Sequence, residues 1–148
     1  MHWSGLGVNR EQRVRQVKSG DASISDFESY IPIGNADEKL RQWAGQGAVI
    51  SYLSSHSNYK DIEKDRLVLQ RYKFPQGDIF YRQSDDTYAD IVIREMPDAF
   101  IEDNCESIGG GKEMASTHLS PDVEKKIHIR TVPEFDGIDH LPDKIADL

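Results

Sequence analysis

Short apolar runs and amphipathic stretches follow one another along this chain, and their alternation predicts a mixed α/β fold. Four compact apolar runs bordered by turn-forming residues read as strands, at residues 48–53, 79–81, 99–101 and 127–132. Apolar positions at helical spacing predict helices near residues 9–18, 35–45, 59–71, 85–96 and 120–126. Helices that alternate with short strands are typical of a layered α/β fold with a mostly parallel sheet.

Local signals also indicate where helices end and which side chains they bury. Asn9 is a suitable N-cap for the first helix, and Gly20 is suited to end it. In the helix near residues 59–71, we expect Ile62, Leu67 and Leu69 to contribute to the core. The sequence therefore predicts both the bounds of these helices and part of the hydrophobic core.

Composition indicates one globular domain spanning residues 1–148, because the chain has no repeat and no linker that would divide it. Hydrophobic residues make up 37% and charged residues 30%, and no apolar run approaches membrane-spanning length. The first residues lack a basic region followed by an apolar one, and the single cysteine fits a reducing compartment, so we expect a cytoplasmic protein. The net charge of −8 argues against nucleic acid as the main partner.

Polar side chains follow two of the predicted strands. Ser54 and Ser55 come after the strand at 48–53, and Glu102 and Asp103 come after the strand at 99–101, with Glu106 three residues further on. Ligands of parallel sheets gather beyond the carboxyl ends of the strands, and adjacent acids there repel one another unless water, a base or Mg²⁺ compensates them. Two alternatives stay open: the acids form a solvated turn, and the serines cap the next helix.

Two cations bracket the strand at 79–81. Lys73 precedes it and Arg82 follows it, so either side chain can supply charge-assisted hydrogen bonds to an anion, and either can equally be an ordinary surface cation. The run Gly109–Lys112 is not a phosphate-binding loop, because Glu106 and Glu113 replace residues that such a loop requires. The histidines show no zinc-type spacing.

The single cysteine, Cys105, is a poor candidate for a nucleophile. It lies among Glu102, Asp103 and Glu106, whose negative charges disfavour a thiolate. We therefore expect the pKa of Cys105 to be raised.

Four segments in order carry a family resemblance: Leu40–Trp43, Gly47–Ser55, Lys73–Gly77 and Pro97–Asp103. Together they resemble the haloacid dehalogenase-like (HAD) superfamily. The chain looks most similar to small uncharacterised HAD-type hydrolases that share a GFP-x-G turn and an IEDDCESIGG loop. The likeness covers residues 34–142.

The resemblance implies a Rossmann-like three-layer fold and Mg²⁺-dependent phosphoryl chemistry on a phosphorylated small molecule or an exposed phosphate group. It implies that Ser54 binds the phosphoryl group and that Glu102 and Asp103 hold Mg²⁺, with Glu106 as a further candidate ligand. Lys73 or Arg82 would neutralise the phosphate. Residues 34–148 would form the core, and the helical segment 1–33 has the size of a small cap.

The chain departs from this family at one motif. HAD enzymes begin with a strand that ends in D-x-D and supplies the nucleophilic aspartate, and no such strand precedes Gly34. Residues 1–5 look like the segment that normally follows this motif. The missing strand would be the first and central one, between the strands at 48–53 and 99–101.

Three explanations account for the missing strand: the natural product starts upstream of Met1, the flanking strands close together, or another chain fills the gap. We expect the first. The leading hypothesis is a HAD-like phosphohydrolase domain that is inactive because the nucleophilic aspartate is missing. The alternatives are a non-catalytic phospho-ligand-binding or regulatory module, and a homo-oligomer in which the open sheet recruits a partner strand.

Overall fold

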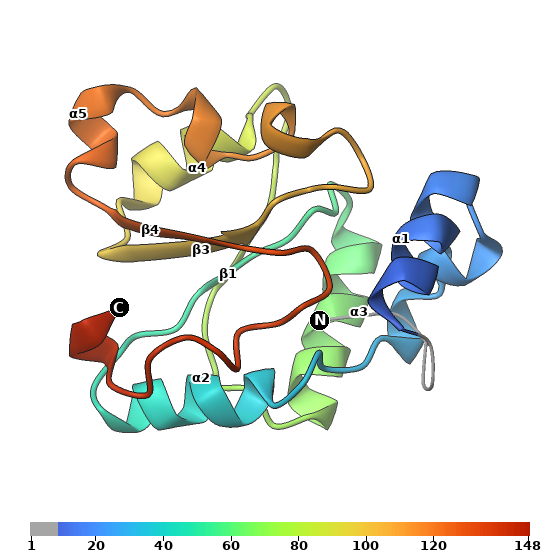
Figure 1. Ribbon diagram of the computed structural model, residues 1–148, viewed down its shortest axis with the longest axis horizontal. Coiled ribbons are helices and arrows are strands. Elements are labelled where there is room, and N and C mark those ends of the chain that lie inside the picture. Colours follow the sequence, from blue (N-terminus) through green and yellow to red (C-terminus); the bar gives the residue numbers. More distant parts are fainter. Residues whose placement is uncertain (1–8) are drawn as a thin grey trace.

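The computed structural model describes residues 9–148 (Figure 1). The described residues form five α-helices and four short strands, which alternate as the sequence pattern predicts. In chain order these are α1 (Arg10–Ser19), α2 (Ala36–Gly45), β1 (Tyr52–Leu53), α3 (Tyr59–Arg71), β2 (Ile79–Phe80), α4 (Tyr88–Glu95), β3 (Ala99–Asp103), α5 (Pro121–Glu124) and β4 (His128–Val132). Within these residues, no helix has both the length and the apolar character needed to cross a bilayer.

The strands pair in parallel, which confirms the mixed α/β prediction at that level. β1 pairs with β2, and β3 pairs with β4 over five residues. They form two separate two-stranded sheets and not one continuous sheet. Within residues 9–148, β1 and β3 each have a strand partner on one side only.

β1 lies between two hydrophobic clusters because successive side chains of a strand point to opposite faces. Leu53 packs against a cluster that includes Phe100 of β3 and Val92 of α4. Tyr52 packs on the other side, against a cluster that contains Phe74 and Leu69. In Figure 1 the strands accordingly lie between α4 and α5 above and α2 below.

Local signals account well for the helix ends. The Asn9 side chain caps α1 in a reciprocal capping box with Gln12, and Gly20 ends the helix in the left-handed conformation, so both predictions are confirmed. The α3 helix has the predicted bounds, and Asn58 caps it by accepting a hydrogen bond from the backbone N–H of Asp61 at 3.0 Å.

One predicted core position is wrong. Leu67 is 52% exposed, whereas Ile62 and Leu69 are buried as predicted and Val68 is fully buried. Leu67 lies five positions after Ile62, and at 3.6 residues per turn this places the two side chains well apart around the helix axis.

The segment before α2 lies across the carboxyl ends of both strand pairs. The Arg10 side chain forms an ion pair with Glu106, which follows β3, and donates to the Glu134 carbonyl oxygen, which follows β4, at 2.9 Å. In the same segment, Phe27 contacts His56, which follows β1. One short stretch of chain therefore contacts the ends of β1, β3 and β4, so these ends lie on the same side of the molecule.

Candidate functional site

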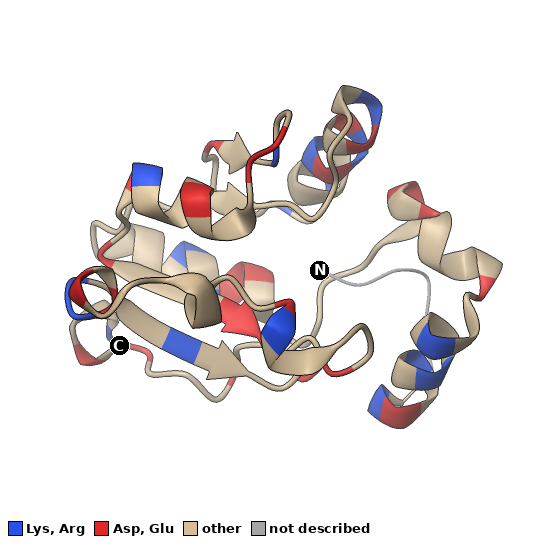
Figure 2. Cartoon of the chain, turned by 90° about the horizontal axis from the view of Figure 1, so that it is seen from above, with Lys and Arg blue, Asp and Glu red and all other residues tan. Residues whose placement is uncertain are grey.

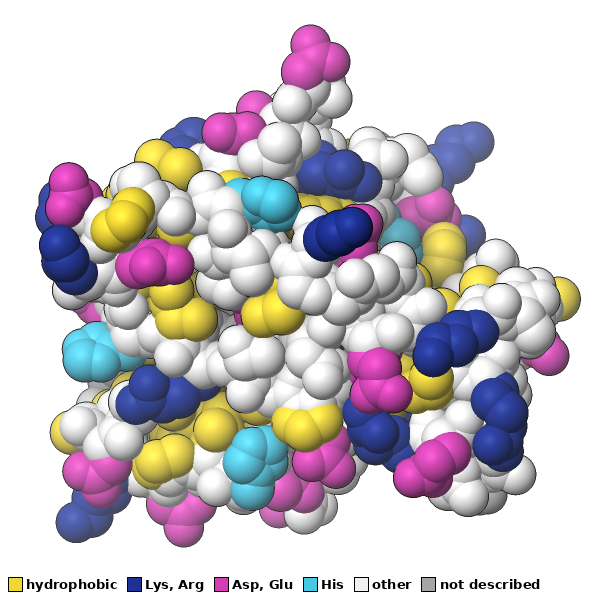
Figure 3. Space-filling view, turned by 45° about the horizontal axis from the view of Figure 1, so that its top comes forward, with side chains coloured by type: hydrophobic (Ala, Val, Ile, Leu, Met, Phe, Trp, Pro, Cys, Tyr) yellow, Lys and Arg dark blue, Asp and Glu magenta, His cyan; other side chains and the backbone are white. Residues whose placement is uncertain are grey.

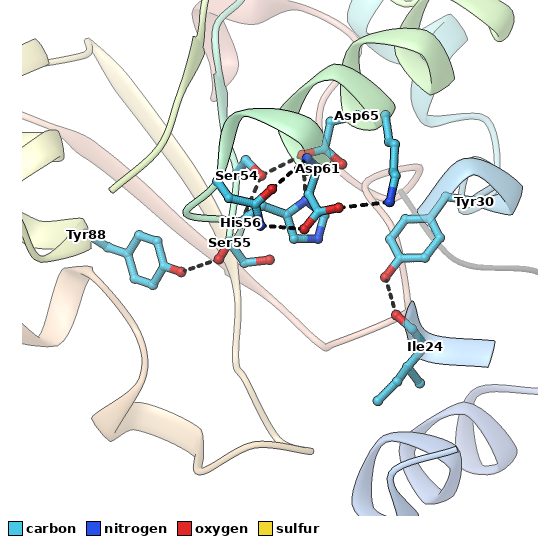
Figure 4. A network of polar contacts seen from close by, with 10 residues as sticks. Ile24, Tyr30, Ser54, Ser55, His56, Asp61, Asp65 and Tyr88 are labelled. Atoms are coloured by element: carbon cyan, nitrogen blue, oxygen red, sulfur yellow. Dashed lines mark hydrogen bonds and ion pairs between the residues drawn. The ribbon is translucent and has the colours of Figure 1, made fainter. Parts of the chain in front are cut away.

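The first group of polar side chains lies where β1 ends and α3 begins (Figure 4). The Ser54 hydroxyl donates a hydrogen bond to Asp65 Oδ2 at 2.6 Å, and His56 Nδ1 lies 3.0 Å from the same oxygen. The backbone N–H of His56 donates to Ser54 Oγ at 3.1 Å. Asp65 is only 5% exposed, so one buried carboxylate ties the end of β1 to the middle of α3.

This network changes the role that the sequence suggests for Ser54. Its hydroxyl hydrogen is directed to Asp65 and is therefore not free to bind a phosphoryl oxygen in this arrangement. The alternative that the two serines cap α3 is wrong, because Asn58 is the N-cap. Ser55 is exposed, and its carbonyl oxygen accepts a hydrogen bond from the Tyr88 hydroxyl at 3.0 Å.

Aromatic side chains cover the Ser54–Asp65 network. The rings of Phe27 and His56 have centroids 4.0 Å apart, and the Lys64 ammonium lies 5.4 Å from the Phe27 centroid. Tyr30 lies beside them and donates to the carbonyl oxygen of Ile24 at 3.0 Å. Burial raises the pKa of Tyr30 to about 12, and the negative charge of Asp65 acts in the same direction.

A cavity of about 370 Å³ lies just beyond the end of β2, lined by Ser57, Arg82, Ser84 and Asp86. The guanidinium carbon of Arg82 lies 4.5 Å from the centroid of the Tyr88 ring. Among the described residues, no carboxylate forms an ion pair with Arg82, whereas Asp86 forms one with Arg94 at 3.2 Å. Arg82 is therefore a cation at a cavity without a neutralising partner of its own.

Glu102 has a structural role at the end of β3. The strand continues to Asp103, so alternation places the Glu102 side chain on the same face as the buried Phe100. There its two oxygens accept hydrogen bonds from the backbone N–H groups of Ala115 and Ser116 at 2.9 and 3.0 Å. Glu102 thus binds the start of a 3₁₀ turn at Ser116–His118.

The other two predicted acids also have partners within the chain. Asp103 is exposed and accepts the backbone N–H of Cys105 at 2.8 Å, and Glu106 forms an ion pair with Arg10. Glu134, which is only 7% exposed, accepts hydrogen bonds from the backbone N–H and the hydroxyl of Ser107, both at 2.6 Å. Glu134, which follows β4, and Arg10 of α1 therefore hold the loop after β3 in place.

These acids surround Cys105 as the sequence predicts. Burial raises the pKa of Cys105 to about 12, and the charge of Asp103 is the next cause. The predicted direction is confirmed, and the thiol is not activated as a nucleophile.

The described residues do not supply a ready Mg²⁺ site. Among residues 9–148, no group of three or more His, Cys, Asp or Glu side chains is placed to hold a metal ion. Both oxygens of Glu102 bind backbone N–H groups, Glu106 is paired with Arg10, and one oxygen of Asp103 accepts the Cys105 N–H. The donor set in this arrangement does not fit the cation that the sequence suggests.

The structure separates the two candidate phosphate-binding cations. Arg82 follows β2, whereas Lys73 precedes it, in the turn between α3 and β2. Because β1 and β2 are parallel, Lys73 lies at the opposite end of the strand pair from Ser54 and Arg82. Only Arg82 shares an edge with the serines.

Three residues that organise this region were not identified from the sequence: Asp65, Tyr88 and Glu134. A signal for Asp65 was present, since it lies three residues after Ile62 and four before Leu69, on the buried stripe of α3. An acid on an apolar stripe indicates a buried partner. No comparable local signal marks Tyr88 or Glu134, whose partners are 33 and 27 residues away in sequence.

Charge is unevenly distributed around this edge. Figure 2 shows basic residues concentrated on α1 and acidic residues at the end of β3. Figure 3 shows acidic and basic side chains interspersed over one face of the molecule. Of residues 1–33, which the family resemblance predicts as a small cap, the structure describes residues 9–33. The predicted likeness of residues 1–5 to the segment that follows the D-x-D motif lies outside the described residues.

Comparisons with protein-family models, with curated proteins and with solved structures find no match to this chain. We therefore infer the function from the geometry of the described residues.

Proposed function

We propose that this chain is a phosphate-binding domain whose ligand is a phosphorylated small molecule or an exposed phosphate group, bound at the cavity beyond β2. The observation that carries the proposal is the guanidinium of Arg82 at that cavity, without an ion-pair partner among the described residues. Guanidinium groups bind phosphate through two parallel N–H···O bonds, and such charge-assisted bonds are stronger than neutral ones. Ser57 and Ser84 line the same cavity, and their hydroxyls are suitable further donors.

The acid in the cavity wall is compatible with this proposal. Asp86 pairs with Arg94, so part of its charge is already offset. The position of the cavity supports the same conclusion, because ligands of parallel sheets bind beyond the carboxyl ends of the strands.

We also propose that the scaffold is a HAD-like, Rossmann-like three-layer fold whose first, central strand is not found among residues 9–148. The two parallel pairs support this arrangement, since β1 and β3 each lack a strand on one side within residues 9–148. Leu53 of β1 packs against the cluster that contains Phe100 of β3, which supports placing the two strands near each other. A fifth parallel strand between them would join the two pairs into one sheet.

A Mg²⁺-dependent phosphohydrolase is the second candidate. It is favoured by Asp103, an exposed carboxylate at the end of β3 on the same side of the molecule as the end of β1. Against it, the described acids do not fit a Mg²⁺ site, and Ser54 is bound to Asp65. We therefore place binding ahead of turnover.

A phosphate titration followed by ¹H–¹⁵N NMR tests the proposal. Inorganic phosphate should shift the amide signals of residues 82–86 and of Ser57, and Arg82→Gln should weaken binding about 10- to 100-fold, as expected for the loss of charge-assisted bonds. Lys73→Gln is the matched control, because it removes one positive charge at the other end of β2, and it should bind as the parent does. Unchanged binding by Arg82→Gln, or no shift at residues 82–86 in the parent, would refute the site.

The same protein samples distinguish a phosphate-binding domain from a phosphohydrolase. Incubation with 4-nitrophenyl phosphate and MgCl₂ should give no turnover if the domain only binds phosphate. Turnover that is lost in Asp103→Asn would favour the phosphohydrolase.

A further inference from the structure

We infer that Tyr88 is a positioning residue of the phosphate site: its ring orients the Arg82 guanidinium, and its hydroxyl fixes the end of β1 against the same side chain. This inference rests on the proposed function, since it concerns how that site is built. Tyr88 does not itself touch the ligand and acts through Arg82.

The position of Tyr88 is itself well determined. It is the first residue of α4, and the preceding Thr87 caps that helix reciprocally with Asp90: Thr87 Oγ1 accepts the Asp90 backbone N–H at 3.1 Å, and Asp90 Oδ2 accepts the Thr87 backbone N–H at 2.8 Å. The ring is partly buried and packs against the cluster that contains Phe100. A rigid ring at the start of a capped helix is a stable platform for a long, flexible arginine.

Two contacts connect this platform to the site. The Tyr88 hydroxyl donates to the Ser55 carbonyl oxygen at 3.0 Å, which ties the chain leaving β1 to α4. The guanidinium carbon of Arg82 lies 4.5 Å from the ring centroid, within the range of a cation–π contact. One side chain thus links the residues that follow β1 and β2, the two segments that also supply Ser57 and Arg82 to the cavity wall.

The contact has a consequence for ligand recognition. The N–H donors of a guanidinium lie in its plane, so a ring beneath one face leaves the donors at the edge available. Such an edge matches two oxygens of one phosphate group. The chemistry that fits is a terminal phosphate with two accessible oxygens, in a cavity of about 370 Å³ that leaves room for a small organic group.

Two substitutions separate the functions of the ring and the hydroxyl. Tyr88→Phe keeps the ring and removes the bond to Ser55, and it should weaken phosphate binding less than Tyr88→Leu does, because the contact with Arg82 is retained. Tyr88→Leu removes the ring, and it should weaken phosphate binding about two- to fivefold, the range expected for an exposed cation–π contact. Circular dichroism and the melting temperature establish whether each variant is folded.

A spectroscopic measurement distinguishes positioning from simple packing. A proton above an aromatic ring resonates upfield, so the Arg82 Nε–H signal of the unliganded parent should be shifted upfield. The shift should persist in Tyr88→Phe and disappear in Tyr88→Leu. A residue that only packs in the core would lower the melting temperature of Tyr88→Leu without changing phosphate affinity.

These measurements distinguish a failure of the positioning role of Tyr88 from a failure of the phosphate-binding proposal. If the parent does not bind phosphate, the binding proposal fails, and the Arg82 signal still reports whether the ring orients the guanidinium. If the parent binds phosphate but Tyr88→Leu binds equally well, the positioning role is wrong. An Arg82 Nε–H signal without an upfield shift in the parent overturns it even if Tyr88→Leu does not fold.

Discussion

The carboxylate of Asp65 allows a quantitative test of how the end of β1 is held. Asp65→Asn keeps the size and shape of the side chain but removes the negative charge that accepts from Ser54 at 2.6 Å and from His56 at 3.0 Å. Hydrogen bonds to charged groups contribute about 1 kcal/mol more than neutral ones. With two such bonds in a site that is only 5% exposed, we expect a loss of about 2 kcal/mol in the free energy of unfolding.

Urea denaturation at pH 7, followed by circular dichroism, measures this loss. For a chain of this size the melting temperature should fall by about 4–8 °C. Glu63→Gln is the control, because Glu63 lies on the same helix in an exposed ion pair with Arg66, and it should change stability by less than about 0.5 kcal/mol. A double-mutant cycle with Ser54→Ala should give a coupling above about 0.5 kcal/mol. Stability of Asp65→Asn within about 0.5 kcal/mol of the parent would refute the reasoning.

Two further predictions concern the loop after β3 and the turn before β2. The pKa of Cys105 is raised from about 9 to about 12, so the thiol of the folded protein stays protonated between these two pH values. Iodoacetamide at pH 8.5 should therefore alkylate the native protein at least about 100-fold more slowly than the urea-unfolded chain. Equal rates would contradict this prediction. Gly77→Ala should lower the free energy of unfolding by about 1–3 kcal/mol, because the new methyl group would lie 1.9 Å from the Ile50 carbonyl oxygen. Gly45→Ala, in α2 with open space around it, should instead stabilise by about 0.5–1 kcal/mol in the same denaturation assay, and a similar loss in both variants would show that the Ile50 contact is not the cause.

The sequence predicted best the features that depend on neighbouring residues. Capping by Asn9 and termination by Gly20 both involve groups within one helical turn, and they are confirmed. The α/β alternation is confirmed for the same reason, since apolar periodicity is a local property. The parallel pairing is confirmed as well, although it joins strands distant in sequence, because alternating helices and strands favour parallel pairing. The direction of the pKa shift of Cys105 also followed: burial is its largest cause, and the charge of Asp103, two residues away, acts in the same direction.

Side-chain partners that are distant in sequence could not be predicted from local patterns. Ser54 was assigned to a phosphate, and the structure pairs it with Asp65, which faces it only after α3 packs against β1. Glu102 was assigned to a metal, and it binds backbone N–H groups that lie 13 and 14 residues later. Both pairings have one cause: a polar group near the core takes the partner that packing brings to it, and that partner is distant in sequence.

The residues along the chain determined the helices, the strand positions and their order, because backbone hydrogen bonds within a helix and the period of apolar side chains are encoded locally. Which groups meet at the strand ends was decided by the tertiary structure. Parallel pairing placed Arg82 at the edge with the serines and Lys73 at the other edge, and the packing of α4 placed Tyr88 beneath Arg82. The physical reason is that burial gives a polar or charged group a strong preference for a partner, while the chain's three-dimensional path alone determines which partner is within reach.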